Sequence, residues 1–314
     1  MARIAYLGPE GTFTEAALRQ ITAAGLVPEH GLGEVQPSPV ESNSAALDAV
    51  RDGAADYACV PIENSIDGSV TPTLDSLAIG SPLQVFAETT LNVAFSIVVK
   101  PGRGATDVRT LAAFSVAAAQ VRQWVAVNLP DAKLRPAYSN ADAAQQVAEG
   151  HVDAAVTSPL AAERWGLATV ADGVVDEPNA RTRFLLVGRP GPPPARTGAD
   201  RTSVVLRIDN APGSLLAALA EFGVRGIDLT RIESRPTRTG LGTYRFFADC
   251  VGHIDDDAVA EALKALYRRC ADVRYLGSWP TGSPAGALPP PADEAARWLT
   301  QLRHGKQAAR GAQR

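Results

Sequence analysis

Cysteine is scarce in this 314-residue chain, which contains only Cys59, Cys250 and Cys270. An odd number of cysteines without a regular spacing argues against a disulfide framework and favours buried free thiols. The four histidines lie far apart in the sequence and match no zinc-binding motif. We therefore expect the chemistry of this protein to proceed without a metal.

The sequence also lacks an apolar run of about 18 residues, the length that a membrane-spanning helix needs. Its first residues lead into a strand at 4–7 rather than a signal peptide, so we expect a cytoplasmic protein. A net charge of -4 argues against partners such as nucleic acid or a membrane surface, which require basic patches. The composition, 46% hydrophobic and 20% charged, is typical of a globular protein with two or three domains.

The most informative stretch is an apolar strand at 57–60 that runs into the sequence Pro-Ile-Glu-Asn-Ser at 61–65. Because proline cannot continue a hydrogen-bonded ladder, we expect the strand to end there, with polar side chains on a stiff turn. In open α/β sheets, ligands bind at the carboxyl edge where such turns lie. The alternative is an ordinary Asx turn between a strand and a helix.

A second polar turn, Gly-Pro-Glu-Gly-Thr-Phe-Thr-Glu at 8–15, follows the first strand. Thr12 and Glu15 have the spacing of a capping box, which predicts a helix that begins at Phe13. The glycines allow backbone N–H groups to approach a ligand, and the positive end of the helix favours an anion. An anion site and a plain capped turn both remain open.

An internal repeat relates residues 39–58 to residues 136–155. Each copy has a Ser-Asn pair before a predicted helix and a Gly-x-x-Asp sequence before a short apolar strand. The repeat predicts two similar α/β lobes, with the polar ends of their strands lining one cleft.

Two arginines flank a hydroxyl in the sequence Asn-Ala-Arg-Thr-Arg at 179–183, just before the strand 184–188. The planar guanidinium group suits carboxylates, so these residues predict a seat for an acidic substrate. Solvation of a strand start is the alternative.

The C-terminal part begins with a linker rich in proline and glycine at 189–202. Beyond it, the sequence predicts the order β-α-β-β-α-β between 203 and 276, which is typical of a ferredoxin-like sandwich. Such a sheet leaves an edge or a face for a second subunit. The remaining tail, 281–314, is predicted to be solvated, with one short helix near 292–303.

Five motifs, in order and with matching spacing over roughly residues 3–280, resemble the prephenate dehydratase family; they lie at 8–13, 61–65, 68–75, 182–184 and 233–236. The resemblance implies an α/β, bilobal catalytic region similar to type II periplasmic binding proteins at 1–188, followed by a ferredoxin-like (βαββαβ) ACT regulatory domain at 203–280. Within the catalytic region, we expect lobe 1 at about 1–80 plus 166–188, and lobe 2 at about 81–165.

The activity that the resemblance implies is a carbon–oxygen lyase reaction of phenylalanine biosynthesis, in which prephenate becomes phenylpyruvate, water and carbon dioxide without a cofactor. Because the ring becomes aromatic, the enzyme chiefly needs a hydrogen-bond donor for the departing hydroxyl and anchors for two carboxylates. The resemblance assigns catalysis to Thr182, Glu63 and Asn64, and substrate binding to Thr12, Ser65, Gln120, Arg183 and Phe184. The serine that the family places ahead of the glutamine is Ala113 here, and Ser115 is the candidate substitute.

For the ACT domain, the resemblance implies that L-phenylalanine binds at an interface between subunits of a homodimer or homotetramer and regulates the enzyme allosterically. The residues implied are Asn210, Gly213, Ser214, Leu215, Glu233, Ser234, Arg235 and Pro236. Two other functions remain open: an arogenate dehydratase, which acts on the transaminated analogue of prephenate, and a non-catalytic, bilobal amino-acid sensor.

Overall fold

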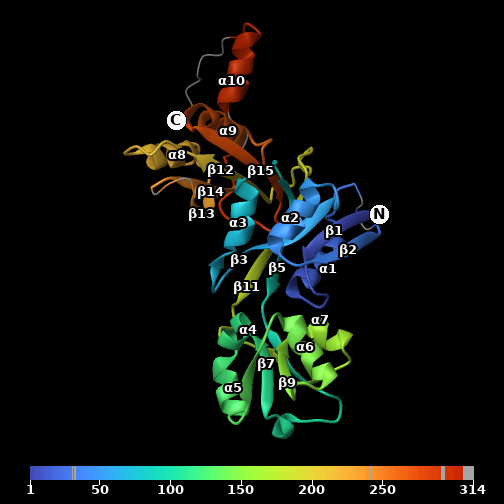
Figure 1. The fold of residues 1–314 in the computed structure, drawn as a ribbon. Coiled ribbons are helices and arrows are strands. Elements are labelled where there is room, and N and C mark those ends of the chain that lie inside the picture. Colours follow the sequence, from blue (N-terminus) through green and yellow to red (C-terminus); the bar gives the residue numbers. More distant parts are fainter. Residues whose placement is uncertain (30, 32, 239, 241, 291–293, 307–314) are drawn as a thin grey trace, which may run out of the picture. The chain divides into compact units, whose positions relative to one another are not determined.

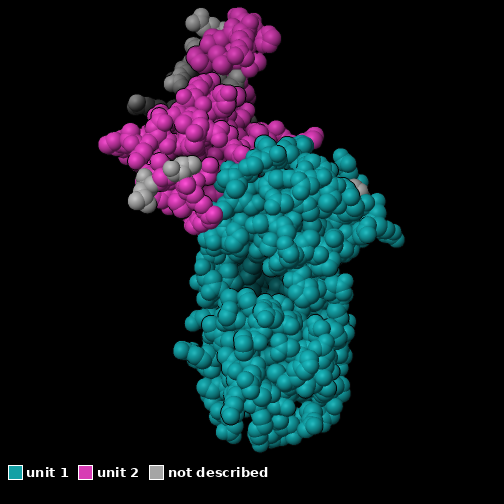
Figure 2. Space-filling view, in the orientation of Figure 1, with its two compact units in different colours: residues 1–191 teal, residues 192–314 magenta. Residues whose placement is uncertain are grey.

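The computed structural model describes residues 1–314 except 30, 32, 239, 241, 291–293 and 307–314. The chain divides into two compact units, Met1–Gly191 and Pro192–Arg314 (Figures 1 and 2). Within the described ranges, no helix is long and apolar enough to cross a membrane. The parts of the predicted tail at 291–293 and 307–314 lie outside the described residues.

The first unit contains two sheets, and the first of them has the strand order β2-β1-β3-β11-β5, with β4 paired to β3. Its strands are β1 (Ala2–Leu7), β2 (Val35–Val40), β3 (Tyr57–Asn64), β4 (Gly68–Ser69), β5 (Gln84–Asn92) and β11 (Arg181–Gly188). Its helices are α1 (Phe13–Ala23), α2 (Asn43–Arg51) and α3 (Thr71–Ala78). Leu18 and Ile21 of α1 pack with Tyr6 and Phe184 on one face of this sheet, and α2 and α3 lie on the other (Figure 1).

The second sheet has the order β10-β6-β9-β7-β8. Its strands are β6 (Phe95–Val99), β7 (Thr110–Phe114), β8 (Lys133–Ala137), β9 (Ala154–Thr157) and β10 (Ala168–Val174). The helices of this lobe are η1 (Ala105–Asp107), α4 (Ser115–Gln120), α5 (Arg122–Asn128), α6 (Asn140–Glu149) and α7 (Pro159–Arg164). The carboxylate of Asp176 accepts the backbone N–H groups of Gln123 and Trp124 in the first turn of α5.

The two copies of the internal repeat form the same structural unit in the two lobes. In the first, β1 pairs in parallel with β2 and β3; in the second, β7 pairs in parallel with β8 and β9. The repeated aspartates also make equivalent hydrogen bonds. The Asp56 carboxylate accepts the backbone N–H of Arg3 at 2.9 Å, and the Asp153 carboxylate accepts that of Thr110 at 2.8 Å. Each carboxylate therefore holds the start of one strand to the start of its neighbour. The matching pairing in the two lobes confirms the predicted bilobal α/β class.

The boundaries between the lobes differ from the prediction. Strand β5, expected in lobe 2, pairs with β11 in the first sheet, and β10, expected in lobe 1, pairs with β6 in the second. The chain thus crosses between the sheets at 92–95 and again at 174–181. The apolar run 83–100 contains two buried strands, one from each sheet, and hydrophobicity alone does not say which sheet a buried strand joins.

Strand β3 also extends further than predicted, through Pro61 to Asn64. Its parallel pairing with β1 ends at Cys59, and β4 pairs with β3 only at Glu63 and Asn64, so among the described strands that side of β3 has no partner at Val60 and Pro61. Proline is tolerated at such an edge because no ladder hydrogen bond is required there. The polar residues that follow Pro61 therefore extend along β11 instead of ending the strand.

The second unit has the predicted β-α-β-β-α-β order and an antiparallel sheet of order β13-β14-β12-β15. Its elements are β12 (Asp200–Arg207), α8 (Ser214–Gly223), β13 (Leu229–Pro236), β14 (Tyr244–Val251), α9 (Asp257–Arg269) and β15 (Asp272–Pro280), followed by α10 (Glu294–Arg303). Phe222 of α8 and Leu266 of α9 pack against Val204, Leu206 and Ala248 of the sheet. The ferredoxin-like fold of this unit is confirmed.

Candidate active site

The end of β3 and the beginning of β11 lie at the same edge of the first sheet, because these two strands are antiparallel. Figure 2 shows that the surface of residues 1–191 is hollowed between its upper and lower parts, which carry the first and second sheets in Figure 1. The sheet edge therefore presents the residues of two predicted motifs together.

Asn64 and Thr182 are directly paired across these strands. The Asn64 Nδ2 donates to the Thr182 Oγ1 at 2.9 Å, while the Asn64 Oδ1 accepts the backbone N–H groups of Ile66 and Asp67 at 2.8 and 3.1 Å. The turn therefore fixes the orientation of the amide. The buried Thr182 hydroxyl accepts this bond, and no acceptor among the described residues takes its proton. The arrangement leaves the Thr182 hydroxyl as a hydrogen-bond donor.

Arg183 joins two carboxylates on the opposite face of the same strand. Its Nε donates to the Glu63 Oε1 at 3.1 Å, and its Nη1 donates to the Glu88 Oε2 at 3.1 Å. The side chains of Arg183 and Glu88 are buried, whereas Glu63 is 38% exposed. Glu63, to which the resemblance assigns a catalytic role, thus lies on the face of Arg183 and not on that of Thr182.

A β-bulge explains this division of the two faces. The register between β11 and β3 shifts between Arg183 and Phe184, so Phe184 pairs with Pro61 while Arg183 pairs with Glu63. Side chains alternate between the faces of a strand, and one extra residue exchanges them. The bulge is what directs Asn64 toward Thr182 and Glu63 toward Arg183.

Two predicted substrate-binding residues have local roles in the first lobe. Phe184 is buried in the core with Tyr6 and α1. The Thr12 hydroxyl donates to the Leu7 carbonyl at 3.0 Å and accepts the Glu15 N–H at 3.3 Å, which confirms the predicted helix start at Phe13. These contacts use Thr12 as a helix cap.

The Glu15 carboxylate holds the loop before α1. It accepts the Gly11 N–H at 2.6 Å and the Arg19 Nη2 at 2.7 Å. Burial, together with the negative charges of Glu15 and Glu10, raises the pKa of Tyr6 to about 12. The Tyr6 phenol is therefore neutral at physiological pH.

Gln120 and Ser65 lie near the turn that follows β3. The buried Gln120 donates from Nε2 to the Asp67 Oδ2 at 3.4 Å, and its Oε1 is buried without a hydrogen-bond partner among the described residues. The Ser65 Oγ accepts the Arg181 N–H at 2.9 Å, which ties the turn to the residue before Thr182. Ser115, the candidate substitute for the family serine, is the first residue of α4.

Ser158 follows β9, at one of the two polar strand ends that the repeat predicts to line the cleft, but the sequence assigns it no role. Its buried Oγ donates to the Gly11 carbonyl at 2.5 Å and accepts the Ala161 N–H at 3.1 Å, so it caps α7 and joins the two lobes. Gly11 has a φ of 92°, and a Cβ there would lie 3.0 Å from that of Ala161. The available signal was the Ser-Pro start of a helix, which predicts a cap but not its partner across the cleft.

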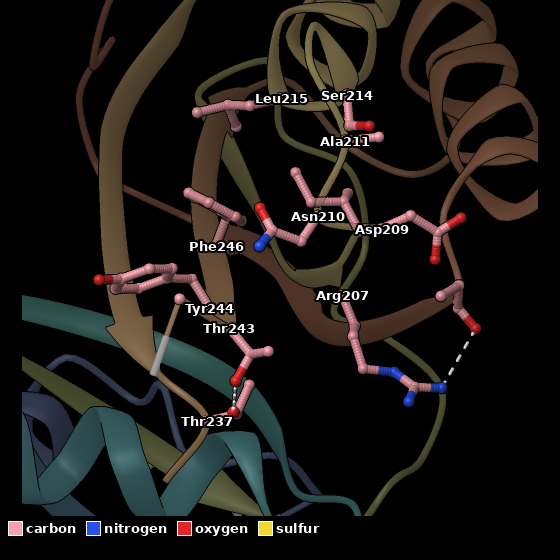
Figure 3. A pocket seen from close by; sticks show the side chains of 13 residues that line it. Arg207, Asp209, Asn210, Ala211, Ser214, Leu215, Thr237, Thr243, Tyr244 and Phe246 are labelled. Carbon is pink, nitrogen blue, oxygen red and sulfur yellow. Dashed lines mark hydrogen bonds between the residues drawn. The ribbon is translucent and has the colours of Figure 1, made fainter. Parts of the chain in front are cut away.

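The second unit has a pocket of about 330 Å³ between the loop before α8 and strand β14 (Figure 3). It is lined by Arg207, Ile208, Asp209, Asn210, Ala211, Ser214, Leu215, Thr237, Gly242, Thr243, Tyr244, Phe246 and Ala271. Three predicted effector residues, Asn210, Ser214 and Leu215, therefore line it, and Gly213 caps α8 with a φ of 80°. The predicted residues 233–236 lie on the edge strand β13, next to the lining residue Thr237.

Comparisons with known proteins agree with both units. The family model described as prephenate dehydratase matches residues 4–192, and the ACT domain model matches residues 202–266. A prephenate dehydratase of Mycobacterium avium (strain 104) is 84% identical over 306 residues, which cover 98% of this chain and 97% of that protein. One of Mycobacterium tuberculosis (strain H37Rv) is 81% identical over 306 residues, covering 98% of this chain and 95% of the relative.

A solved structure is similar over nearly the whole chain. The prephenate dehydratase of Arthrobacter aurescens, in complex with L-Phe, is 40% identical with a TM-score of 0.83, covering 96% of this chain and 100% of that one.

Proposed function

The chain belongs to the prephenate dehydratase family, and we propose that it converts prephenate to phenylpyruvate, water and carbon dioxide. The observation that carries this proposal is the hydrogen bond from Asn64 to Thr182, which leaves the threonine hydroxyl as a donor in the cleft. We assign the reaction to the region 1–188 and regulation to the region 203–280.

In the proposed reaction, the bond between the ring and its carboxylate breaks, and its electrons enter the ring as carbon dioxide leaves. The ring C–O bond breaks at the same time, and its electron pair leaves on the hydroxyl oxygen. That oxygen needs a proton to become water, and solvent supplies it. Thr182 donates a hydrogen bond to the departing oxygen, and Asn64 stabilises the charge that builds on the Thr182 Oγ1. Assistance of this kind typically accelerates a reaction by about 10²–10⁴-fold.

Substrate binding is assigned to groups around the hydroxyl donor. The Gln120 Oε1, which has no hydrogen-bond partner in the described part of the chain, supports a role in holding a polar group of the substrate, since a buried oxygen without a partner is costly. The loop 8–12 before α1 is a candidate seat for a carboxylate, because the positive end of a helix attracts anions. Arg183 contributes through its ion pairs with Glu63 and Glu88.

We further propose that L-phenylalanine occupies the pocket of the second unit and regulates the enzyme. The pocket combines apolar walls, Leu215 and Phe246, with the polar Asn210 and Asp209, as an amino acid requires (Figure 3). The Arthrobacter aurescens relative was solved in complex with L-Phe. Residues 233–236 on the edge strand β13 are assigned to the facing subunit of a homodimer or homotetramer.

The test is to incubate the purified protein separately with prephenate and with arogenate. The proposal predicts phenylpyruvate from prephenate, seen by its ultraviolet absorbance in alkali, and little phenylalanine from arogenate. Faster turnover of arogenate would make the protein an arogenate dehydratase. Binding of either compound without turnover would favour a sensor and contradict the proposal.

A further inference from the structure

We infer that Glu88 is a positioning residue for the proposed reaction, which acts through Arg183 and Glu63 to keep Asn64 on Thr182. The inference rests on the proposed function, and it concerns a residue outside the recognised motifs. Glu88 lies on β5, the edge strand, 95 positions before Arg183 in the chain.

Arg183 lies on the central strand of a set of three, with β3 on one side and β5 on the other. Its guanidinium therefore reaches a carboxylate on each neighbouring strand, at 3.1 Å from Glu63 and 3.1 Å from Glu88. Only a planar group with several N–H donors can satisfy two partners in this way, and a lysine ammonium cannot reproduce the fork. The three side chains form one clamp across three strands.

The burial of the clamp shows which of its two ion pairs anchors it. Arg183 and Glu88 are each 7% exposed, whereas the Glu63 side chain faces partly into solvent. A buried charge that loses its partner is strongly destabilised, because neither water nor another group replaces the lost interaction. Glu88 thus holds Arg183 in place, and Arg183 in turn holds Glu63.

The clamp acts where the strand pairing is irregular. The bulge between Arg183 and Phe184 decides which residue of the Glu63-Asn64 pair faces Thr182. A slip of one residue moves every following side chain to the other face of a strand. The ion pair from Arg183 to Glu63 opposes that slip, because it is formed only when Glu63 lies on the face of Arg183. Through this register, Glu88 keeps the amide of Asn64 on the catalytic hydroxyl.

The experiment is a double-mutant cycle on turnover of prephenate, with Glu88→Gln, Arg183→Met and the double variant. We expect Glu88→Gln to lower kcat on the order of 10- to 100-fold, because misplacing a catalytic group by about 1 Å costs about that much. KM should change much less than kcat, since Glu88 contacts Arg183 on the face of the sheet opposite Thr182. In the Arg183→Met background, Glu88→Gln should have almost no further effect on kcat. Glu88→Asp, which keeps the charge, should recover part of the activity.

A purely structural role for Glu88 would give a different result. Glu88→Gln would then lower the melting temperature while kcat per folded molecule stayed unchanged, and the inference would be wrong. Equal, additive losses of kcat in both backgrounds would also overturn it. The matched control is Asp56→Asn, which removes the ion pair with Arg3 at the opposite end of β3 and should leave kcat unchanged.

A second measurement does not depend on activity. This measurement is the nuclear magnetic resonance spectrum of the Asn64 side-chain amide. In the wild type, one Nδ2 proton donates to Thr182 and the other does not, so the two proton resonances should be well separated. The signals are assigned to Asn64 because they disappear in the variant Asn64→Asp. In Glu88→Gln this separation should collapse, and unchanged resonances would contradict the inference. Wild-type protein that fails to convert prephenate would instead contradict the proposed function, and the amide resonances would still report on the clamp.

Discussion

The amide of Asn64 donates to the hydroxyl of Thr182 at 2.9 Å, although the two residues lie 118 positions apart. Because the Asn64 Oδ1 is taken by two backbone N–H groups of the following turn, the amide cannot rotate to accept from the threonine. The threonine proton is thereby kept for another acceptor. The fold therefore fixes the direction of the hydrogen bond between Asn64 and Thr182, and not only the distance between the two side chains.

Replacing Asn64 by aspartate tests this direction. The carboxylate still accepts the N–H groups of Ile66 and Asp67, so the turn should persist, but it accepts the Thr182 proton instead of donating to Thr182. We expect kcat for prephenate to fall by about 10²–10³-fold, which is typical for loss of one such donor. The measurement is steady-state formation of phenylpyruvate, with the fold checked by circular dichroism.

The control is Asn64→Ala, which removes both the donor and the turn acceptor. It should lower both kcat and the stability of the protein, whereas Asn64→Asp should lower kcat with a smaller loss of stability. An aspartate variant with wild-type kcat would show that the direction of the hydrogen bond is unimportant.

The bond between Ser158 and Gly11 predicts an unusually large effect for a helix cap. Ser158→Ala loses the cap of α7 and leaves the buried Gly11 carbonyl without its donor, so we expect a loss of about 1–3 kcal/mol in the free energy of unfolding. Ser139→Ala removes only the cap of α6 and should cost about 1 kcal/mol. Urea unfolding of both variants compares them, and equal losses would mean that the contact between the lobes contributes nothing.

Stability should depend on pH through the two repeated aspartates. The Arg3 side chain and its N–H lower the pKa of Asp56, and the Thr110 hydroxyl, followed by backbone N–H groups, lowers that of Asp153. A carboxyl with a depressed pKa in the folded state stabilises it above its unfolded pKa and loses this contribution as pH falls through the folded value. The difference in urea midpoint between wild type and Asp56→Asn or Asp153→Asn should therefore shrink between pH 6 and pH 2. A difference that grew with acid would contradict the assignment.

Regulation through the second unit is tested by binding of L-phenylalanine. Asn210→Ala should weaken the affinity on the order of 10-fold, as expected for loss of one hydrogen bond to a charged ligand, whereas Asn128→Ala in the other unit should not change it.

By linkage, L-phenylalanine and a substrate analogue should alter each other's affinity by the same factor, with a coupling of about 1–3 kcal/mol. Titration calorimetry with and without the analogue measures it. Equal affinities in both experiments would exclude the coupling.

Much of this arrangement could be predicted from the sequence, because it depends on local chemistry. The repeat predicted two similar lobes, and the cap at Thr12 predicted the start of α1. The strand, helix and turn signals after residue 202 predicted the ferredoxin-like order. Each of these follows from residues close together in the chain.

The remaining features depend on pairing between distant strands. The bulge near Pro61 exchanges the faces of Glu63 and Asn64, and a strict period of two places them the other way round. Glu88 carried no signal, because a glutamate on an apolar strand is informative only when its arginine partner is known. Ser158 had a local signal as a helix cap, but its acceptor, the Gly11 carbonyl, lies in the other lobe and could not be predicted.

The most direct test of the whole account is the kcat for prephenate of Thr182→Val beside that of Thr182→Ser. Valine has nearly the shape of threonine but no hydroxyl, so we expect a loss of about 10²–10⁴-fold. Serine keeps the hydroxyl and should retain kcat within about 10-fold of the wild type. If the valine variant turned over prephenate nearly as fast as the wild type, Thr182 would not be the donor to the departing hydroxyl.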